Sequence, residues 1–185
     1  DALKDQVAIS LAHTTADYDT AKEAYDRGAC HATHLYNAMP PFSHRAPGVI
    51  GAACDNPHVC AELICDGIHL HPATVRTTFK MFGDDRLILI SDSMMATGLN
   101  DGEYALGGQP VTVRGNLATL ADGTIAGSAT NLMDCVRTAV KKMDIPLGSA
   151  VKCAAVNSAK AVGIYDRYGS ITPGKTANLV LLDKD

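Results

Sequence analysis

The chain has 185 residues, 46% of them hydrophobic and 19% charged, so it can bury a sizeable core but is short for a complete eight-stranded α/β barrel of about 250 residues. Its net charge of -4 and pI near 5.9 leave no basic field to attract nucleic acid or an anionic membrane, so we expect small-molecule partners. No apolar run approaches the about 20 residues that span a bilayer, and no signal-like segment opens the chain, so we expect a soluble, cytoplasmic protein.

The chain ends and the cysteines add two expectations. The first residue is Asp1 rather than Met, and apolar runs lie close to both ends, so we expect a piece of a longer protein with more chain missing before Asp1 than after Asp185. The six cysteines, at positions 30, 54, 60, 65, 135 and 153, contain no pair separated by two residues. We therefore expect the buried, reduced thiols of a cytosolic enzyme.

Strand-like apolar runs alternate with helix-like runs through residues 7–91. The predicted strands are 7–12, 29–33, 59–65 and 86–91. The predicted helices are 15–27, begun by Thr15 or Asp17 and ended by Gly28, and 72–82, begun by Pro72. A long functional loop is predicted between the second and third strands, because several residues there exclude regular structure: Pro40, Pro41, Pro47, Gly48 and Gly51.

The alternation breaks after Gly98. Short alternating segments from Glu103 to Ile125, separated by turn pairs such as Asp122-Gly123, predict β-hairpins in an excursion beside the site. Helices are predicted at 131–143 and 147–162, and the closing stretch 171–182 is predicted to be a turn followed by a strand. The repeated order of strand then helix before the break predicts parallel strands with right-handed crossovers, and hence an α/β sheet or barrel.

Three side chains capable of metal binding or proton transfer lie just beyond these strands. His13 and His34 follow the first and second predicted strands, and Asp92 follows the fourth. The carboxyl ends of parallel strands in a barrel face one shared site, so these groups can converge although they are far apart in the sequence. Taken singly, each histidine could be a structural residue, and Asp92 could cap the loop that follows it. His31 is predicted to point to the opposite face from His34 and to pack outside the barrel.

Six short segments in a fixed order resemble the N-acetylglucosamine-6-phosphate deacetylase family of the amidohydrolase superfamily. They are 10–14 (Ser-Leu-Ala-His-Thr), 33–39 (Thr-His-Leu-Tyr-Asn-Ala-Met), 44–48 (His-Arg-Ala-Pro-Gly), 66–69 (Asp-Gly-Ile-His), 91–92 (Ser-Asp) and 125–128 (Ile-Ala-Gly-Ser). The resemblance runs from about Ile9 to the end of the chain, and the tail from Ile171 to Asp183 resembles the signature of the superfamily.

This resemblance implies a fold, a domain division and a set of roles. The fold is a (β/α)8 TIM barrel of amidohydrolase type, with residues 1–165 as its C-terminal portion, a hairpin excursion at about 102–125, and residues 166–185 returning to a small β domain. His13 and His34 would be metal ligands and Asp92 the catalytic acid and base. The substrate-binding residues would be Asn37, Ala38, Arg45, His69, Ala126, Gly127 and Ser128.

The resemblance also implies parts that this chain does not contain. A missing N-terminal half of the same protein would supply the first barrel strands, much of the small β domain, and a glutamate that completes the metal site. Phosphate contacts would come partly from a neighbouring subunit of a homodimer.

The chemistry of these residue types fits the implied reaction. Neutral imidazoles suit Zn²⁺, with iron or another divalent ion as alternatives, and such an ion lowers the pKa of a bound water to about 7. Amide hydrolysis also needs a protonated leaving nitrogen, and Asp92 can take a proton from the attacking water and pass it to the amine. The Arg45 guanidinium matches two phosphate oxygens, although it could equally be a solvated loop charge. His71 could take the place assigned to His69.

Three functions remain open at this point. The first is hydrolysis of the acetamido group of N-acetylglucosamine 6-phosphate to glucosamine 6-phosphate and acetate, in amino-sugar catabolism. The second is another amidohydrolase, acting on a cyclic amide or an N-acyl amino acid, which would have no phosphate requirement. The third is a catalytically silent fragment that binds a sugar phosphate, favoured by the missing glutamate.

Overall fold

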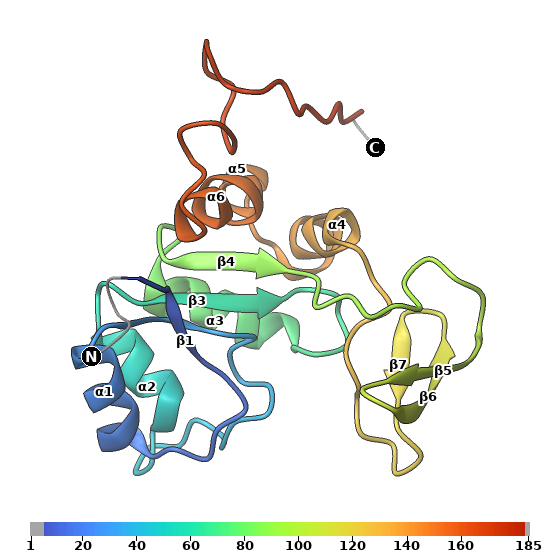
Figure 1. Ribbon diagram of the computed structural model, residues 1–185, viewed down its shortest axis with the longest axis horizontal. Helices are drawn as coiled ribbons and strands as arrows, with labels where there is room; N and C mark the ends of the chain where they lie inside the picture. Colours follow the sequence, from blue (N-terminus) through green and yellow to red (C-terminus); the bar gives the residue numbers. More distant parts are fainter. Residues whose placement is uncertain (1–5, 184–185) are drawn as a thin grey trace.

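The computed structural model describes residues 6–183 and is built around a parallel sheet of four strands (Figure 1). The strands are β1 (Ile9–Leu11), β2 (Ala29–Ala32), β3 (Cys60–Ile64) and β4 (Leu87–Ile90). Their order in the sheet is their order in the chain, and every neighbouring pair is parallel. The predicted parallel α/β sheet is therefore confirmed, and each strand lies within the apolar run that predicted it.

One helix crosses between each pair of neighbouring strands: α1 (Tyr18–Asp26), α2 (Gly48–Asp55) and α3 (Pro72–Phe82). Asp17 begins α1, because its carboxylate accepts a hydrogen bond from the N–H of Thr20 at 2.9 Å. Asn131 begins α4 (Leu132–Met143) in the same way, accepting from the N–H of Asp134 at 2.9 Å.

The main core lies on the helix side of the sheet. Ala61 and Leu63 of β3 and Val75 of α3 are each 0% exposed. Since side chains alternate along a strand, Cys60 and Glu62 belong to the other face of β3, and both are only half-buried. The sheet therefore has one fully covered face and one face that the described residues leave partly open.

The segment predicted as an irregular loop contains α2, so that prediction is wrong. The helix begins directly after Pro47, where a missing backbone N–H costs nothing. Gly51 is required rather than disruptive, because a Cβ there would lie 2.5 Å from the Cβ of Pro47. Val49 and Ile50 are buried, and α2 packs along α1. Burial and close packing thus outweigh the weak helix propensity of glycine.

A second sheet lies where the sequence predicts hairpins, beyond the carboxyl end of β4 (Figure 1). It is antiparallel and contains β5 (Gly102–Leu106), β6 (Gln109–Arg114) and β7 (Leu117–Thr119). It has a small core of its own, formed by Met94, Ala96, Val111, Val113, Ala118, Ala126 and Ala129. This sheet stands beside the strand ends that carry the predicted site.

The last helical stretch fixes the start of β4. It consists of α5 (Leu147–Val151), a π-helical turn (Lys152–Val156) and α6 (Asn157–Ala161). The buried side-chain amide of Asn157 donates to the carbonyl oxygens of Asp84 and Leu87, each at 2.7 Å. The Arg86 guanidinium donates to several backbone carbonyl oxygens, among them that of Asn56 at 2.9 Å. These contacts attach the start of β4 to α6 and to the end of α2.

The expected closing strand at 171–182 is absent from the described residues. Turns are followed by an extended segment that pairs with no other strand of the described chain. Its apolar side chains are exposed, Leu181 by 96%. A strand needs a neighbour for its backbone hydrogen bonds, so the apolar run alone does not form one. Among the described helices, none has the length and apolar character needed to cross a membrane.

Candidate functional site

Two imidazoles converge at the carboxyl ends of neighbouring strands. His13 follows β1 and is exposed, whereas His34 follows β2 and is only 5% exposed. Their Nε2 atoms lie 2.9 Å apart, and the rings meet edge to face at 76°. The structure therefore brings together the two residues that the sequence predicts as metal ligands.

The backbone is strained at these strand ends. The φ angles are 44° at His13, 32° at His34 and 50° at Asp92, all in the left-handed region that L-residues rarely adopt. Tyr36 and Ala38 share this conformation, with φ of 79° and 53°. Left-handed non-glycine residues cost about 1–2 kcal/mol each and persist only where the surroundings hold them. The strain is thus concentrated in the segments predicted to bind metal and substrate.

The histidine pair fits part of a metal site. Two nitrogens 2.9 Å apart can both lie within the about 2.0–2.1 Å that zinc takes to imidazole. The Nδ1 of His34 is buried without a hydrogen-bond partner. Across residues 6–183, no three His, Cys, Asp or Glu side chains form a group that could hold a metal ion. The described residues therefore supply two ligands and no third.

Glu62 is a neighbour of this pair that the sequence reasoning missed. Its Oε2 accepts a hydrogen bond from the backbone N–H of His34 at 3.4 Å. Burial raises the pKa of Glu62, and the hydrogen bond from His34 acts in the opposite direction. The signal was present as a carboxylate within the otherwise apolar run of β3.

His31 does not pack outside the sheet as predicted. It pairs in parallel register with Cys60, so its side chain lies on the same open face as Cys60 and Glu62. The prediction assumed that strand alternation continues from His31 to His34. β2 ends at Ala32, and His34 has a φ of 32°, so the alternation does not extend to His34.

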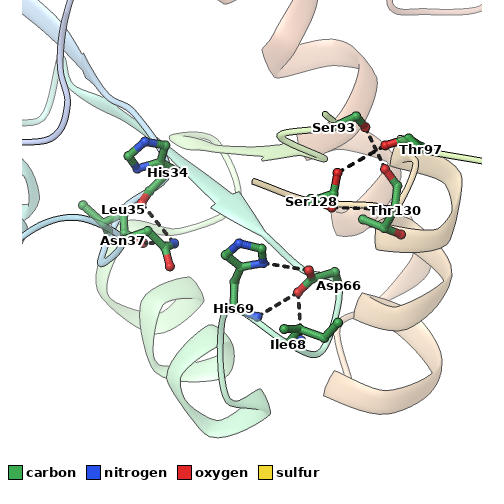
Figure 2. A network of polar contacts seen from close by, with 10 residues as sticks. All are labelled: His34, Leu35, Asn37, Asp66, Ile68, His69, Ser93, Thr97, Ser128 and Thr130. Atoms are coloured by element: carbon green, nitrogen blue, oxygen red, sulfur yellow. Dashed lines mark hydrogen bonds and ion pairs between the residues drawn. The ribbon is translucent and has the colours of Figure 1, made fainter. Parts of the chain in front are cut away.

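His69 is held by a buried carboxylate. Asp66 accepts from the Nδ1–H of His69 at 2.7 Å, and from the backbone N–H groups of Ile68 at 2.8 Å and His69 at 2.9 Å (Figure 2). Burial alone would raise the pKa of Asp66, but these hydrogen bonds together lower it. The His69 side chain is 6% exposed. Its Nε2 forms no hydrogen bond with any residue of the described range 6–183, so it can bind another partner. His71 instead caps α3, accepting from the N–H of Ala73 at 3.1 Å.

The loop after β2 carries three predicted substrate-binding residues. The Asn37 amide donates to the carbonyl oxygens of His34 at 3.2 Å and Leu35 at 3.4 Å, which fixes it beside His34 (Figure 2). Ala38 is exposed. Arg45 is also exposed, and the described structure joins it to the ring of His44 at 2.6 Å but to none of the other predicted site residues.

The segment from Ala126 to Ser128 runs beside Asp92. The Ser128 N–H donates to the Asp92 carbonyl oxygen at 3.0 Å, and Ser93 forms a parallel bridge with Ser128. Gly127 has a φ of 66°. Asp92 itself is exposed at the end of β4. The backbone of Asp92 and the predicted substrate-contacting segment are therefore adjacent. Figure 2 shows His69 between Asn37 and Ser128.

A model of the amidohydrolase family matches residues 1–185. The chain belongs to this family. N-acetylglucosamine-6-phosphate deacetylase from Bacillus subtilis is 47% identical to this amidohydrolase over 184 residues, which cover 99% of the chain and 46% of that protein. N-acetylgalactosamine-6-phosphate deacetylase from Escherichia coli is 36% identical over 182 residues, covering 98% of the chain and 48% of that protein. The resemblance predicted from six short segments is confirmed.

Solved structures of such deacetylases also resemble this chain. N-acetylglucosamine-6-phosphate deacetylase from Pasteurella multocida matches with a TM-score of 0.90 at 36% identity, covering 95% of this chain and 46% of that one. An aspartate-to-alanine variant of the Mycobacterium smegmatis enzyme, in complex with N-acetyl-D-glucosamine 6-phosphate, matches with a TM-score of 0.91 at 39% identity, covering 96% and 48%. The chain spans about half the length of the relatives that it matches.

Proposed function

We propose that this chain is part of a metal-dependent hydrolase that converts N-acetylglucosamine 6-phosphate to glucosamine 6-phosphate and acetate. The observation that carries the proposal is the convergence of His13 and His34, whose Nε2 atoms lie 2.9 Å apart at the strand ends. Two relatives that align with nearly the whole of this chain are named for this activity. The protein would act in the cytoplasm on a small-molecule amino-sugar phosphate.

The full site would need more than this chain. The edge strands β1 and β4 each pair on one side only within the described residues, which is expected of a segment taken from a closed (β/α)8 barrel. An N-terminal half would add the remaining strands and a glutamate as third ligand, and residues 166–185 would return to a small β domain. The assembly would be a homodimer.

His13 and His34 would hold a divalent ion, for which zinc is the expected choice, and amidohydrolases generally use such an ion. When bound, the ion would polarise the amide carbonyl and make an attacking hydroxide available at neutral pH. Asp92, exposed beyond β4, would take the proton of the attacking water and pass it to the departing nitrogen. The free Nε2 of His69 would bond the sugar, with Asp66 fixing the ring.

The phosphate would be bound by the loop after β2. Arg45 offers a planar pair of donors, and the backbone N–H groups near Asn37 and Ala38 add further ones. Ala126, Gly127 and Ser128 would form the substrate wall next to Asp92. Binding energy from the phosphate would hold the acetamide in place at the metal.

Acetate release from a panel of substrates tests the proposal on the intact protein. N-acetylglucosamine 6-phosphate should be hydrolysed far faster than unphosphorylated N-acetylglucosamine, and equal rates would refute the proposal. The N-acetylgalactosamine 6-phosphate arm is included because one relative bears that activity. If the 4-epimer were the preferred substrate, the assignment of the sugar would be wrong.

The role of Arg45 has its own measurement. Arg45→Ala should raise KM for the phosphorylated substrate by about tenfold to a hundredfold, the value of one charge-assisted contact. Arg114→Ala, which changes an exposed arginine on β6, is the matched control and should leave KM unchanged. An unaltered KM in Arg45→Ala would show that this residue is a solvated charge.

A further inference from the structure

The segment from His34 to Met39 needs a restraint that the assigned roles do not supply. Its φ angles are positive at alternate residues, 32° at His34, 79° at Tyr36 and 53° at Ala38. Each of these residues would relax toward negative φ if nothing held it. The same short segment carries a predicted metal ligand and the predicted phosphate-binding residues, so its relaxation would move both.

Tyr36 supplies such a restraint through its side chain. Its hydroxyl lies 2.6 Å from the Oγ1 of Thr78 on α3, and its ring packs against the main core. Thr78 is 0% exposed and donates its single hydroxyl proton to the carbonyl oxygen of Thr74 at 2.8 Å. Because that proton is used, the Tyr36 hydroxyl must be the donor to Thr78. The hydrogen bond therefore runs from Tyr36 to Thr78, and its acceptor on α3 is not accessible to water.

This contact joins the two edges of the substrate site. α3 begins at Pro72, directly after the loop in which Asp66 holds His69. Figure 2 shows Asn37 and His69 facing the same space from these two segments. The Tyr36 to Thr78 bond is a polar side-chain contact that ties the first segment to the helix that follows the second.

We propose that Tyr36 is a positioning residue, whose hydrogen bond to Thr78 sets the separation between the Asn37 and Ala38 edge of the site and the His69 edge. The inference rests on the proposed function, because those edges matter as two halves of one sugar-phosphate site. Tyr36 touches neither substrate nor metal in this scheme and acts through the backbone of its own segment.

Single-atom variants of the intact protein test the proposal. Tyr36→Phe removes only the hydroxyl, and Thr78→Val removes its acceptor. Each should raise KM for N-acetylglucosamine 6-phosphate about threefold to tenfold, the value of one hydrogen bond, while kcat changes less than twofold. The double variant should match either single variant, because both remove the same bond. Tyr18→Phe is the matched control, since it removes a tyrosine hydroxyl bond to Asp55 between α1 and α2.

Hydrogen exchange gives a readout that does not depend on turnover. The Leu35 and Asn37 N–H groups are bonded to the carbonyl oxygens of Glu62 and His34. Their exchange should become severalfold faster in Tyr36→Phe but not in Tyr18→Phe, with the rest of the sheet unchanged. Unchanged exchange and KM in Tyr36→Phe would overturn the proposal. A wild type inactive on the sugar phosphate would refute the proposed function instead, and the exchange measurement would still decide the role of Tyr36.

Discussion

Replacing Asp66 by asparagine tests the buried pair that holds His69. The Asp66 side chain is 0% exposed and accepts three hydrogen bonds, one of them from the Nδ1–H of His69 at 2.7 Å. In Asp66→Asn the amide oxygen can still accept from the backbone N–H groups, but the amide nitrogen would then face the imidazole N–H. The Nδ1–H of His69 then loses a charge-assisted hydrogen bond and, being buried, cannot bond to water instead. The free energy of unfolding should therefore fall by about 2–3 kcal/mol at neutral pH.

The pH dependence gives the sharper measurement. The hydrogen bonds lower the pKa of Asp66 in the folded state below its ordinary value of 3.8, despite burial, which acts to raise it. A group with a lowered folded-state pKa stabilises the fold above the unfolded pKa, and this contribution is lost as pH falls through the folded pKa. The difference between wild type and Asp66→Asn should therefore be constant from neutral pH to about pH 5, and should shrink below about pH 4.

Urea unfolding of the intact protein, followed by circular dichroism across this pH range, measures the difference directly. Asp122→Asn is the matched control, because Asp122 is exposed and accepts from the N–H of Thr124 in a turn. Its effect should be much smaller at every pH. Equal stability of Asp66→Asn and wild type at neutral pH, or a difference that persists unchanged well below pH 4, would refute the reasoning.

Three other changes test separate parts of the structure. Gly127 has a φ of 66°, and a Cβ there would lie 3.4 Å from a leucine side chain. Gly127→Ala should therefore lower the free energy of unfolding by about 1–2 kcal/mol. An unchanged urea midpoint would show that alanine is not strained at this position. Arg86→Lys should lower the free energy of unfolding by about 2–3 kcal/mol, because an ammonium group cannot reproduce the guanidinium bonds to several carbonyl oxygens. Equal thermal stability of wild type and Arg86→Lys would show that these bonds do not stabilise the start of β4. His34→Ala should lose bound metal in elemental analysis of the intact protein, whereas His58→Ala, away from the pair, should keep it. Metal retained by His34→Ala would exclude this histidine as a ligand.

The sheet could be predicted because its signals are local. Residues 87–90 are all apolar and are followed by the polar residues Ser91, Asp92 and Ser93, which is typical of a buried parallel strand. The convergence of His13 and His34 could also be anticipated, because parallel strands place their carboxyl ends at one edge. What the sequence could not show is the distance between the two rings.

The errors have a common physical origin in tertiary context. Gly48 and Gly51 indicate a loop when considered alone, but the helix they begin is stabilised by burial and by close contact with Pro47. Conversely, Leu179 to Leu182 reads as a strand, yet no partner strand is present within the described residues. Glu62 was overlooked because its importance depends on its contact with His34, which follows the neighbouring strand β2. No local sequence pattern reveals such a contact.

The positive φ angles at His13, His34 and Asp92 restrict which amino acids these positions can accept. Apart from glycine, this backbone is adopted most readily by asparagine, aspartate and histidine, and it strongly disfavours β-branched residues. Two of these residue types, aspartate and histidine, coordinate cations and transfer protons. A library of random replacements at these three positions would therefore be enriched, among folded survivors, in aspartate and histidine together with glycine and asparagine, even without selection for catalysis.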